Sequence, residues 1–504
     1  MDKRISEIIK IDDIRQWNNN TITITAGTGT GKSYFIKNIL YAFAKKNNKK
    51  ILMLIHRTNC ANQFQNEINK DKKIDVIDIH TYQKLEFKEI HKYKNLLDQY
   101  QYIVCDEFHY FLSDAAFNKT TDISLNLILS QNATKIFMSA TGDYIKQYLN
   151  RKKKIKTIDY SLPIEYKFEN LVFFNYDTTL VELAKDAIKT SEKIIFFIQS
   201  AQKAYGLYLQ FEKYSLFNCS RNNKQYFKKV DQEKVMDMLV KEKFEENILI
   251  TTTCMDAGIN LIDTDIKHIV CDVKDVGSLI QCIGRKRIKS LDDYVNIYIK
   301  TITNKQLGGI ETQLNKKIEM ADYLKENGIK NYILKYPRQN DYSNIIYDDP
   351  VEENNKCTKK INEMMYFKCK IDLLNINKMK QLGNFGYCKY LANIFGFYNN
   401  SQKYNYIILE EQKEKDILIN YLENIKGTKL FSDERKELKK IFNKAGLKAR
   451  TMGRHTLNGW LKDLGLPYMI NHDIDKRRKL NNGNKNLNRG KRYWIVGKLI
   501  YKEE

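Results

Sequence analysis

The sequence predicts an α/β fold: two successive domains with parallel sheets, followed by a mainly helical and basic C-terminal domain. Short β-branched runs alternate with longer amphipathic stretches up to about residue 300. A glycine-rich turn joins the first of these runs to a helical stretch. From about residue 351 onward the composition shifts to Lys, Asn, Tyr and Leu with helical periodicity. These three observations separate the α/β part of the chain from its C-terminal part.

Length, charge and cysteine spacing exclude several classes of protein. A chain of 504 residues is long enough for about three domains. Its 85 Lys and Arg against 61 Asp and Glu give a formal net charge of +24, which favours nucleic acid as the partner. The sequence contains no long apolar run and its N-terminus is charged, so we expect a soluble, cytoplasmic protein without a membrane contact. The nine cysteines include no C-x-x-C pair, which favours reduced, buried thiols over a zinc site.

Prolines mark the expected domain junctions. Pro163 follows the basic run 151–154, and Pro337 and Pro350 flank a polar segment, which predicts two junctions. We therefore expect a first α/β domain at 1–155, a second at 160–305, a helical connection at 306–350 and the basic domain at 351–504.

The expected strands are the β-branched runs between these junctions. In the first domain they are Thr21–Thr25, Ile51–Ile55, Val76–Ile79, Tyr102–Cys105 and Lys135–Ser139. In the second domain they are Lys193–Ile198, Asn247–Thr251, His268–Cys271 and Tyr294–Ile299.

The turn after the first strand predicts a phosphate-binding loop. It contains Ala26, Gly27, Thr28, Gly29, Thr30, Gly31, Lys32 and Ser33, and a helical run follows it. Glycines let backbone N–H groups approach phosphate oxygens, and the helix N-terminus adds a partial positive charge. Lys32 would neutralise the β and γ phosphates, and the Ser33 hydroxyl would bind Mg²⁺. Ala26 stands where the strict pattern has glycine, and the alternative is a solvent-exposed turn.

Two adjacent carboxylates follow the strand at 102–105. Asp106 and Glu107 come about 70 residues after the glycine-rich turn. Carboxylates at the C-terminal edge of a parallel sheet lie where α/β proteins bind ligands. Asp106 could hold the Mg²⁺ of a nucleotide, and Glu107 could orient and deprotonate the attacking water. The alternative for such a pair is a solvated turn.

Five motifs in order make the chain resemble a superfamily 2 helicase of the DExH type over about 280 residues. The glycine-rich turn at 26–33 resembles motif I, and Asp106-Glu107-Phe108-His109 resembles motif II. Ser139-Ala140-Thr141 resembles motif III, Thr252 to Asp256 with Gly258 and Asn260 resembles motif V, and Gln281 to Arg287 resembles motif VI.

The resemblance implies two RecA-like domains with ATP held in the cleft between them. It implies that Gly258 and Asn260 contact the nucleotide, that Gln281 contacts the nucleotide or the attacking water, and that Arg285 and Arg287 reach the γ-phosphate as arginine fingers. The family places its second arginine three residues after the first, where Ile288 stands here, so Arg285 is the better match of the two. We find no aromatic-plus-glutamine motif before the glycine-rich turn, so the sequence supports triphosphate binding more strongly than adenine specificity.

The resemblance also implies contacts with a nucleic-acid strand. The candidates are polar groups at strand ends, which suit hydrogen bonds to phosphate: Arg57, Thr58, Thr81, Gln199, Ser200, Thr251 and Thr252. Helix capping and turn formation are the alternative for each of these residues. Ser139 and Thr141 would couple the ATP cleft to this strand.

The C-terminal segment concentrates the positive charge. Between Arg435 and Ile500 there are 18 Lys and Arg and four acidic residues. The order of two helices, a basic Asn-rich loop and an aromatic strand resembles a winged-helix unit. Candidate contacts with nucleic acid are Arg450, Arg454, Arg477, Arg478, Lys491 and Arg492, and Trp460 or Trp494 could stack on bases. The alternative is a solvated basic surface over a core that buries both tryptophans.

We therefore expect a helicase or translocase that depends on ATP and Mg²⁺ and acts on nucleic acid, on DNA in preference to RNA, in replication, recombination or repair. The composition resembles that of low-GC bacteria and their phages. One alternative is an RNA-remodelling enzyme with the same core. Another is a nucleic-acid-binding scaffold in which ATP acts as a switch and turns over slowly.

Overall fold

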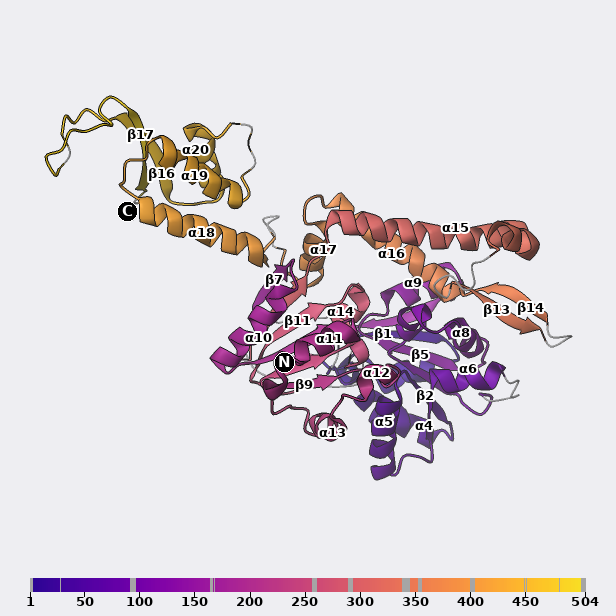
Figure 1. The fold of residues 1–504 in the computed structure, drawn as a ribbon. Coiled ribbons are helices and arrows are strands. Elements are labelled where there is room, and N and C mark those ends of the chain that lie inside the picture. Colours follow the sequence, from indigo (N-terminus) through magenta and orange to yellow (C-terminus); the bar gives the residue numbers. More distant parts are fainter. Residues whose placement is uncertain are drawn as a thin grey trace. The chain divides into compact units, whose positions relative to one another are not determined.

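The computed structural model describes residues 3–27, 29–90, 97–163, 166, 168–255, 261–288, 293–337, 345–351, 356–398, 404–447, 449, 451–479 and 481–499. The chain divides into two compact units (Figure 1). The first comprises 1–171 and 175–406, and the second comprises 172–174 and 407–504.

The first unit begins with an α/β domain on a parallel sheet of strand order β3-β2-β4-β5-β1-β6. Its strands are β1 (Thr21–Thr25), β2 (Ile51–Ile55), β3 (Ile77–Thr81), β4 (Tyr102–Asp106), β5 (Thr134–Ser139) and β6 (Thr157–Ser161). Its helical segments are α1 (Ile5–Ile8), α2 (Ile11–Gln16), α3 (Lys32–Tyr34), the π-helical η1 (Phe35–Leu40), α4 (Tyr41–Lys46), α5 (Thr58–Lys70), α6 (Tyr82–Ile90), α7 (Tyr110–Ser113), η2 (Asp114–Ala116), α8 (Thr121–Leu129) and α9 (Asp143–Arg151).

Both faces of this sheet are buried, which explains why its strands are continuous apolar runs. Ile136 of β5 packs in a core cluster with Phe35, which lies in the helical segment after the glycine-rich turn. The next residue, Phe137, points to the opposite face and packs edge-on against Phe108 at a ring distance of 5.5 Å. The sheet thereby fixes the loop after β1 at both of its ends. It also fixes the loop after β4.

The second α/β domain has the parallel strand order β12-β11-β8-β10-β9. Its strands are β8 (Lys193–Ile198), β9 (Ser215–Asn218), β10 (Ile248–Thr251), β11 (Ile266–Asp272) and β12 (Asn296–Lys300). Its helical segments are α10 (Thr178–Thr190), α11 (Ala201–Tyr208), η3 (Glu212–Tyr214), α12 (Lys224–Phe227), α13 (Gln232–Lys241), η4 (Thr253–Met255) and α14 (Val276–Ile283). The parallel sheets with their connecting helices confirm the predicted fold class of tandem RecA-like α/β domains.

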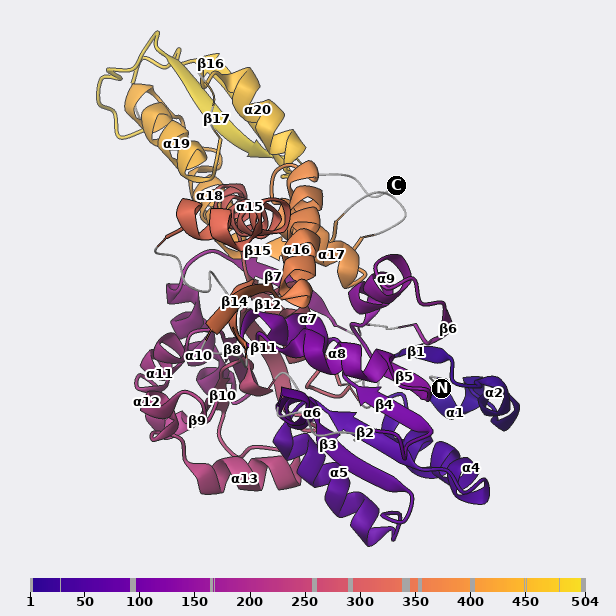
Figure 2. The same cartoon turned by 90° about the vertical axis from the view of Figure 1, so that its right-hand side faces the viewer.

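The first unit continues beyond the second sheet in a largely helical segment. It consists of α15 (Asn304–Lys335), a hairpin of β13 (Ile346–Val351) and β14 (Lys356–Ile361), α16 (Glu363–Gln381) and α17 (Gly386–Ile394). The helix α15 is interrupted at Gly328, whose φ of +72° favours glycine. Figure 2 shows α16 beside α15 and next to α7 of the first domain. Residues of α16 and α17, which the sequence assigned to the C-terminal part, thus group with the α/β domains.

The second unit contains the C-terminal helices and a hairpin. Its elements are α18 (Leu409–Ile425), α19 (Ser432–Lys444), α20 (Arg454–Asp463), β16 (Tyr468–Ile474) and β17 (Arg492–Lys498), with β16 and β17 antiparallel. Leu430, between α18 and α19 in the sequence, forms a single antiparallel bridge to Trp494. Val172–Phe174 of β7 (Asn170–Phe174) and the short β15 (Ile407–Ile408), which pair in parallel, also belong to this unit.

Leu438, Leu457 and Ile470 lie in one buried cluster, so the helices and the hairpin of this unit share a core. Among the described helices of the chain, none combines the length and the apolar character needed to cross a bilayer.

Candidate nucleotide site and nucleic-acid interface

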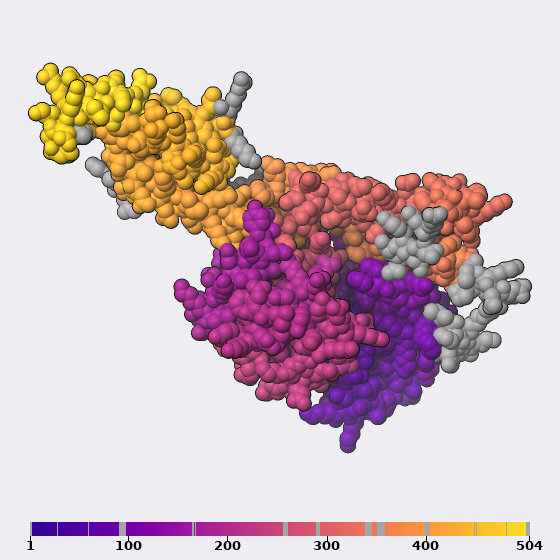
Figure 3. Space-filling view, viewed as in Figure 1, coloured from indigo at the N-terminus to yellow at the C-terminus, as the bar shows by residue number. Residues whose placement is uncertain are grey.

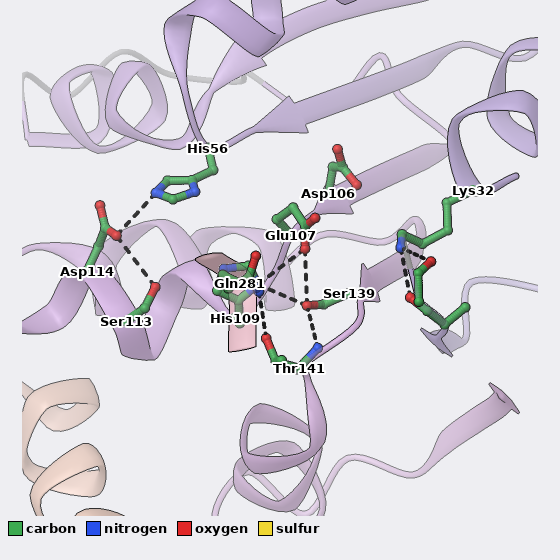
Figure 4. A network of polar contacts seen from close by, with 12 residues as sticks. Lys32, His56, Asp106, Glu107, His109, Ser113, Asp114, Ser139, Thr141 and Gln281 are labelled. Carbon is green, nitrogen blue, oxygen red and sulfur yellow. Dashed lines mark hydrogen bonds and ion pairs between the residues drawn. The ribbon is translucent and has the colours of Figure 1, made fainter. Parts of the chain in front are cut away.

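The loop after β1 closes around the Lys32 side chain. Gly29 and Gly31 have φ of +85° and +87°, a backbone region that side chains disfavour, so the turn requires glycine there. The Lys32 Nζ donates hydrogen bonds to the carbonyl oxygens of Ala26 at 2.8 Å and Gly27 at 2.9 Å (Figure 4). The Thr30 hydroxyl donates to the Gly27 carbonyl at 2.8 Å. The predicted loop residues therefore come together as a compact turn at the start of α3, and Thr28 lies outside the described residues.

The charge of Lys32 is sensitive to its surroundings because its side chain is buried. Burial lowers the pKa of Lys32, the carboxylates of Glu107 and Asp106 oppose this effect, and the cations of Arg287 and Arg285 add to it. An anion bound at the loop would stabilise the charged ammonium group. The charges of both arginines of the second domain therefore act on the Lys32 side chain in the loop.

The carboxylates after β4 have opposite pKa shifts. Burial and the charge of Glu107 raise the pKa of Asp106 to about 7. Burial would raise the pKa of Glu107 too, but the hydrogen bond and charge of His109, with the charge of Lys32, lower it overall. Glu107 therefore remains ionised at neutral pH. Its backbone has φ of +48°, a strained conformation that costs about 1–3 kcal/mol and is common at functional sites.

A chain of polar contacts runs from Glu107 to the second domain (Figure 4). The Glu107 Oε2 lies 3.3 Å from the His109 Nδ1 and accepts a hydrogen bond from the Ser139 hydroxyl at 3.3 Å. The Ser139 Oγ in turn accepts from the backbone N–H of Thr141 at 3.0 Å. The Gln281 Nε2 on α14 donates to the Thr141 hydroxyl at 2.9 Å. The candidates of motifs II, III and VI are thus brought into direct contact across the two domains.

The two candidate arginine fingers have different surroundings. Arg285 is 3% exposed, and its guanidinium donates to the Gln281 backbone oxygen at 3.0 Å and to the Gln281 side-chain oxygen at 3.2 Å. The Arg287 Nη1 would lie 4.0 Å from a Cβ on Gly29, so this guanidinium approaches the glycine-rich turn. Burial and the charge of Arg285 lower the pKa of Arg287 to about 10. Arg287 thus points toward the loop of the first domain, and the charge of Arg285 acts on Glu107.

Lys286, between the two arginines, is anchored inside the second domain. Its Nζ lies 2.6 Å from the Asp293 Oδ2, and both side chains are 1% exposed. The same ammonium group donates to the Arg287 carbonyl at 3.0 Å. This buried ion pair fixes the backbone from which both arginines project. Gly258 and Asn260, the other nucleotide candidates of the second domain, lie outside the described residues.

The candidate Mg²⁺ ligands fit that ion by their chemistry. The Ser33 hydroxyl and the Asp106 carboxylate are oxygen donors of the kind Mg²⁺ prefers. Burial and the neighbouring charge of Glu107 both disfavour the charged form of Asp106 and raise its pKa. A divalent cation at this position would balance the carboxylate charge.

A large cleft of the first unit contains several candidates for nucleic-acid contact. Its volume is about 2600 Å³. The predicted residues on its lining are Arg57, Thr58, Thr141, Gln199, Thr252 and Gln281. Figure 3 shows the indigo surface of the first domain meeting the magenta surface of the second along a seam. Helices α15, α16 and α17 line the cleft as well, through residues such as Lys317, Lys368 and Tyr390. No sequence motif marks these helices, so the sequence did not predict this third wall.

Other predicted contact residues have local structural roles or are buried. The Ser200 hydroxyl accepts from the backbone N–H of Lys203 at 3.3 Å and caps α11. The Thr81 hydroxyl accepts from the backbone N–H of Lys84 at 3.2 Å at the start of α6. Thr251 is fully buried. Helix capping, the alternative considered from the sequence, therefore accounts for the geometry of Ser200 and Thr81.

Arg57 and its neighbour His56 share a carboxylate that the sequence did not single out. The His56 Nε2 lies 3.1 Å from the Asp114 Oδ1, and the Arg57 Nη1 lies 3.9 Å from the Asp114 Oδ2. The His56 ring packs edge-on near His109 at 6.1 Å. Burial lowers the pKa of His56, although Asp114 opposes this shift. The segment after β2 is thereby fixed beside the motif II loop.

In the second unit the predicted basic residues lie at one helix end and along the hairpin. Arg454 begins α20, Arg477, Arg478 and Lys491 lie in the loop between β16 and β17, and Arg492 begins β17. Arg477 is partly neutralised, since its Nε lies 3.4 Å from the Asp475 carboxylate. Arg450 lies outside the described residues.

The tryptophans of this unit pack against its own residues. Trp494 is 8% exposed, with the Arg435 and Lys439 cations each 5.5 Å from its ring. Trp460 packs against Phe442 at a ring distance of 5.6 Å. The alternative of buried tryptophans therefore describes Trp494, whereas Trp460 is only partly buried.

Residues 12–119 match the family model described as an AAA domain. No curated protein matches the chain by sequence. Among solved structures, the chain is similar to the DEAD-box helicase Mss116 bound to ssRNA and UDP-BeF, at 17% identity and a TM-score of 0.45, over 63% of this chain and 72% of that one.

Two further similarities are of the same order. The helicase Lhr of Mycobacterium smegmatis, bound to ssDNA and AMP-PNP, matches at 15% identity and a TM-score of 0.43, over 60% of this chain and 46% of that one. Dbp5 of S. cerevisiae, bound to RNA and ADP BeF3, matches at 16% identity and a TM-score of 0.42, over 58% of this chain and 82% of that one. The function proposed below rests on the residues of this chain itself. In its ordered motifs, its N-terminal AAA-domain match and its tandem parallel sheets, the chain is similar to superfamily 2 helicases.

Proposed function

We propose that the chain is an ATP-dependent, Mg²⁺-dependent nucleic-acid helicase or translocase that acts on DNA in preference to RNA. The observation that carries this proposal is the chain of polar contacts from Glu107 through Ser139 and Thr141 to Gln281. It joins the candidate base of one α/β domain to the helix before the candidate arginines of the other. Hydrolysis at such a site depends on the relative position of the two domains.

Each residue has a role that its geometry supports. The backbone of 27–31 and the Lys32 ammonium group would hold the β and γ phosphates. Glu107 is ionised at neutral pH and could accept a proton from the attacking water. Arg287 and Arg285 would stabilise the charge that develops on the γ-phosphate. Mg²⁺ held by Ser33 and Asp106 would neutralise phosphate charge.

Opening and closing of the cleft would convert hydrolysis into movement along a strand. We propose that the α/β domains at 1–155 and 160–305 each contact the phosphate backbone of one strand, with Arg57 and Thr58 on one side of the cleft and Gln199 and Thr252 on the other. Bound triphosphate favours the closed arrangement, and its hydrolysis removes the contacts that favour it. Alternate closure and opening then move the protein along the strand.

The second unit would contact a duplex, which is the reason for preferring DNA. Its elements follow the winged-helix order, and its hairpin loop has Arg478 and Lys491 exposed to solvent. Exposed cations on such a loop are suited to phosphate contacts that do not depend on sequence. An RNA-remodelling enzyme would use the same ATP site.

Steady-state ATP hydrolysis with single-stranded DNA, duplex DNA, branched DNA and RNA tests the proposal, with Lys32→Ala as the control for contaminating hydrolysis. We expect DNA to stimulate hydrolysis more than RNA, and strand displacement to require ATP. Stimulation by RNA alone would favour the RNA-remodelling enzyme. Tight ATP binding with negligible turnover at saturating nucleic acid would favour the ATP-switched scaffold.

A further inference from the structure

Helix α16 contacts the first α/β domain at several points. The Tyr144 hydroxyl on α9 donates to the Asn375 side-chain oxygen at 3.0 Å. The Phe367 ring packs edge-on against Tyr148 at a ring distance of 5.0 Å. Asn362, which caps α16, also donates to the Asn118 backbone oxygen at 3.4 Å. These contacts link α16 to the first α/β domain.

The same helix contacts the second domain through a partly buried ion pair, in which the Asp275 side chain is 34% exposed. The Lys368 Nζ lies 2.7 Å from the Asp275 Oδ1, and the Lys368 side chain is 15% exposed. Asp372, one turn further along α16, lies 3.1 Å from the same ammonium group. Burial would raise the pKa of Asp275, but the Lys368 charge and hydrogen bond lower it to about 2. The pair is therefore fully charged at neutral pH.

Asp275 is the N-cap of α14, the helix that contains Gln281. Its Oδ2 accepts the backbone N–H of Ser278 at 2.8 Å, so the carboxylate that pairs with Lys368 also fixes the first turn of α14. Gln281 lies less than two turns further along this helix and contacts Thr141, and its backbone oxygen holds Arg285. The position of α16 is thus linked by contacts to the position of the residues at the candidate nucleotide site.

The ion pair also faces the proposed path of nucleic acid. Lys368, Asp275, Asp372 and Asn375 all line the large cleft of the first unit. A phosphate backbone in this cleft would compete with the two carboxylates for the Lys368 ammonium group, because all three are anions at one cation. Nucleic acid in the cleft would then change the Lys368–Asp275 ion pair, through which α16 contacts the N-terminus of α14.

We propose that Lys368 is a positioning residue that couples occupancy of the cleft to ATP hydrolysis, by setting the orientation of α14 through Asp275. This inference rests on the proposed function. Lys368 does not touch the nucleotide; it acts through Asp275, Gln281 and the arginines that follow. The proposal predicts that a variant without the ion pair still binds nucleic acid but loses the stimulation of ATP hydrolysis by it.

The experiment compares kcat and KM for ATP with and without saturating single-stranded DNA, and the melting temperature, in the full chain. The variants are Lys368→Met, Lys368→Arg, the double variant Lys368→Met with Asp275→Asn, and the control Lys370→Met. Lys370 is exposed on the same helix and contacts the Tyr366 ring at 4.3 Å, away from Asp275. The Asn in the double variant keeps an oxygen that can cap α14.

We expect Lys368→Met to reduce the DNA stimulation of kcat at least tenfold, with KM for ATP changed less than threefold. Lys368→Arg should retain most of the stimulation, and Lys370→Met should behave as the wild type. The double variant removes the Asp275 charge together with its cation and leaves only the Asp372 carboxylate without the Lys368 ammonium group, so the melting temperature should return part of the way toward that of the wild type while stimulation stays low. These results together would distinguish a role of the ion pair in coupling DNA binding to hydrolysis from a role in stability only.

Recovery of stimulation together with the melting temperature in the double variant would overturn the proposal, since the pair would then serve only stability. Wild-type stimulation in Lys368→Met would overturn it as well. If DNA and RNA both fail to stimulate the wild-type protein, the proposed function fails, and the inference fails with it. If the wild type is stimulated and Lys368→Met equally so, only the inference fails.

Discussion

Replacing Lys286 with methionine tests how the candidate arginines are held in place. The Lys286 Nζ lies 2.6 and 2.7 Å from the two carboxylate oxygens of Asp293, and both side chains are 1% exposed. Methionine has a similar length but no charge, so the Asp293 carboxylate remains buried without its cation. The Arg287 carbonyl also loses the hydrogen bond that it accepts from Lys286.

The expected loss of stability follows from this burial. Removing one partner of a buried ion pair costs about 3–5 kcal/mol, because the remaining charge has been taken out of water without compensation. For a domain of about 150–250 residues this corresponds to a decrease in melting temperature on the order of 6–20 °C. An exposed ion pair contributes only about 0–1 kcal/mol. Lys234→Met is the matched control, since Lys234 pairs with Glu246 at 2.7 Å but is 60% exposed.

Thermal and urea unfolding of the wild type, Lys286→Met and Lys234→Met measure the difference. Of these two variants, we expect a large loss of stability only in Lys286→Met. This variant should also hydrolyse ATP more slowly, because Arg285 and Arg287 are no longer fixed. The double variant Lys286→Met with Asp293→Leu should regain most of the stability, as neither charge remains. A loss in Lys286→Met no larger than in Lys234→Met would refute this account of the buried pair.

Further predictions concern the nucleotide site and the C-terminal hairpin. Lys32→Ala should abolish binding of a fluorescent triphosphate, whereas Glu107→Gln should retain binding and lose turnover in a steady-state assay; normal hydrolysis in either variant would contradict the assigned roles. In Gly142→Ala the added Cβ would lie 2.0 Å from the Phe108 ring, so we expect a destabilisation of about 1–3 kcal/mol and slower hydrolysis, and unchanged melting would show that the ring moves freely. The affinity for duplex DNA should depend less on salt when hairpin cations are neutralised. The slope of log affinity against log salt concentration should become shallower by about 0.9 for each cation that no longer binds a phosphate. An unchanged slope would exclude a role for the hairpin. The variants for this test are Arg478→Gln, Lys491→Gln and Arg492→Gln.

The central strands could be predicted because both faces of each sheet are buried. Thr21–Thr25, Ile51–Ile55 and Lys193–Ile198 begin and end where the sequence predicts them. The strand β6 was missed because most of its residues are exposed at the sheet edge, so it lacks the continuous apolar run of the central strands. The strand β9 is only four residues long and gives little periodic signal.

The site could be predicted where its residues are contiguous in the chain. A phosphate loop and a carboxylate pair each form from one strand and the turn after it, so local sequence is sufficient. Lys368 and Asp275 are far apart in the chain, and only the tertiary fold brings them together. Neither residue belongs to a motif, and the contact depends on the whole first unit. The sequence therefore predicts the chemistry of the cleft better than its third wall.

Single-turnover ATP hydrolysis by Arg285→Ala and Arg287→Ala tests most directly whether both α/β domains act on one triphosphate. With the protein in excess over ATP and single-stranded DNA saturating, we expect triphosphate binding to persist while the rate of hydrolysis falls on the order of 10³-fold in at least one variant, as for other arginine fingers. Hydrolysis at the wild-type rate in both variants would contradict a shared site, since the second domain would then contribute no charge to the reaction.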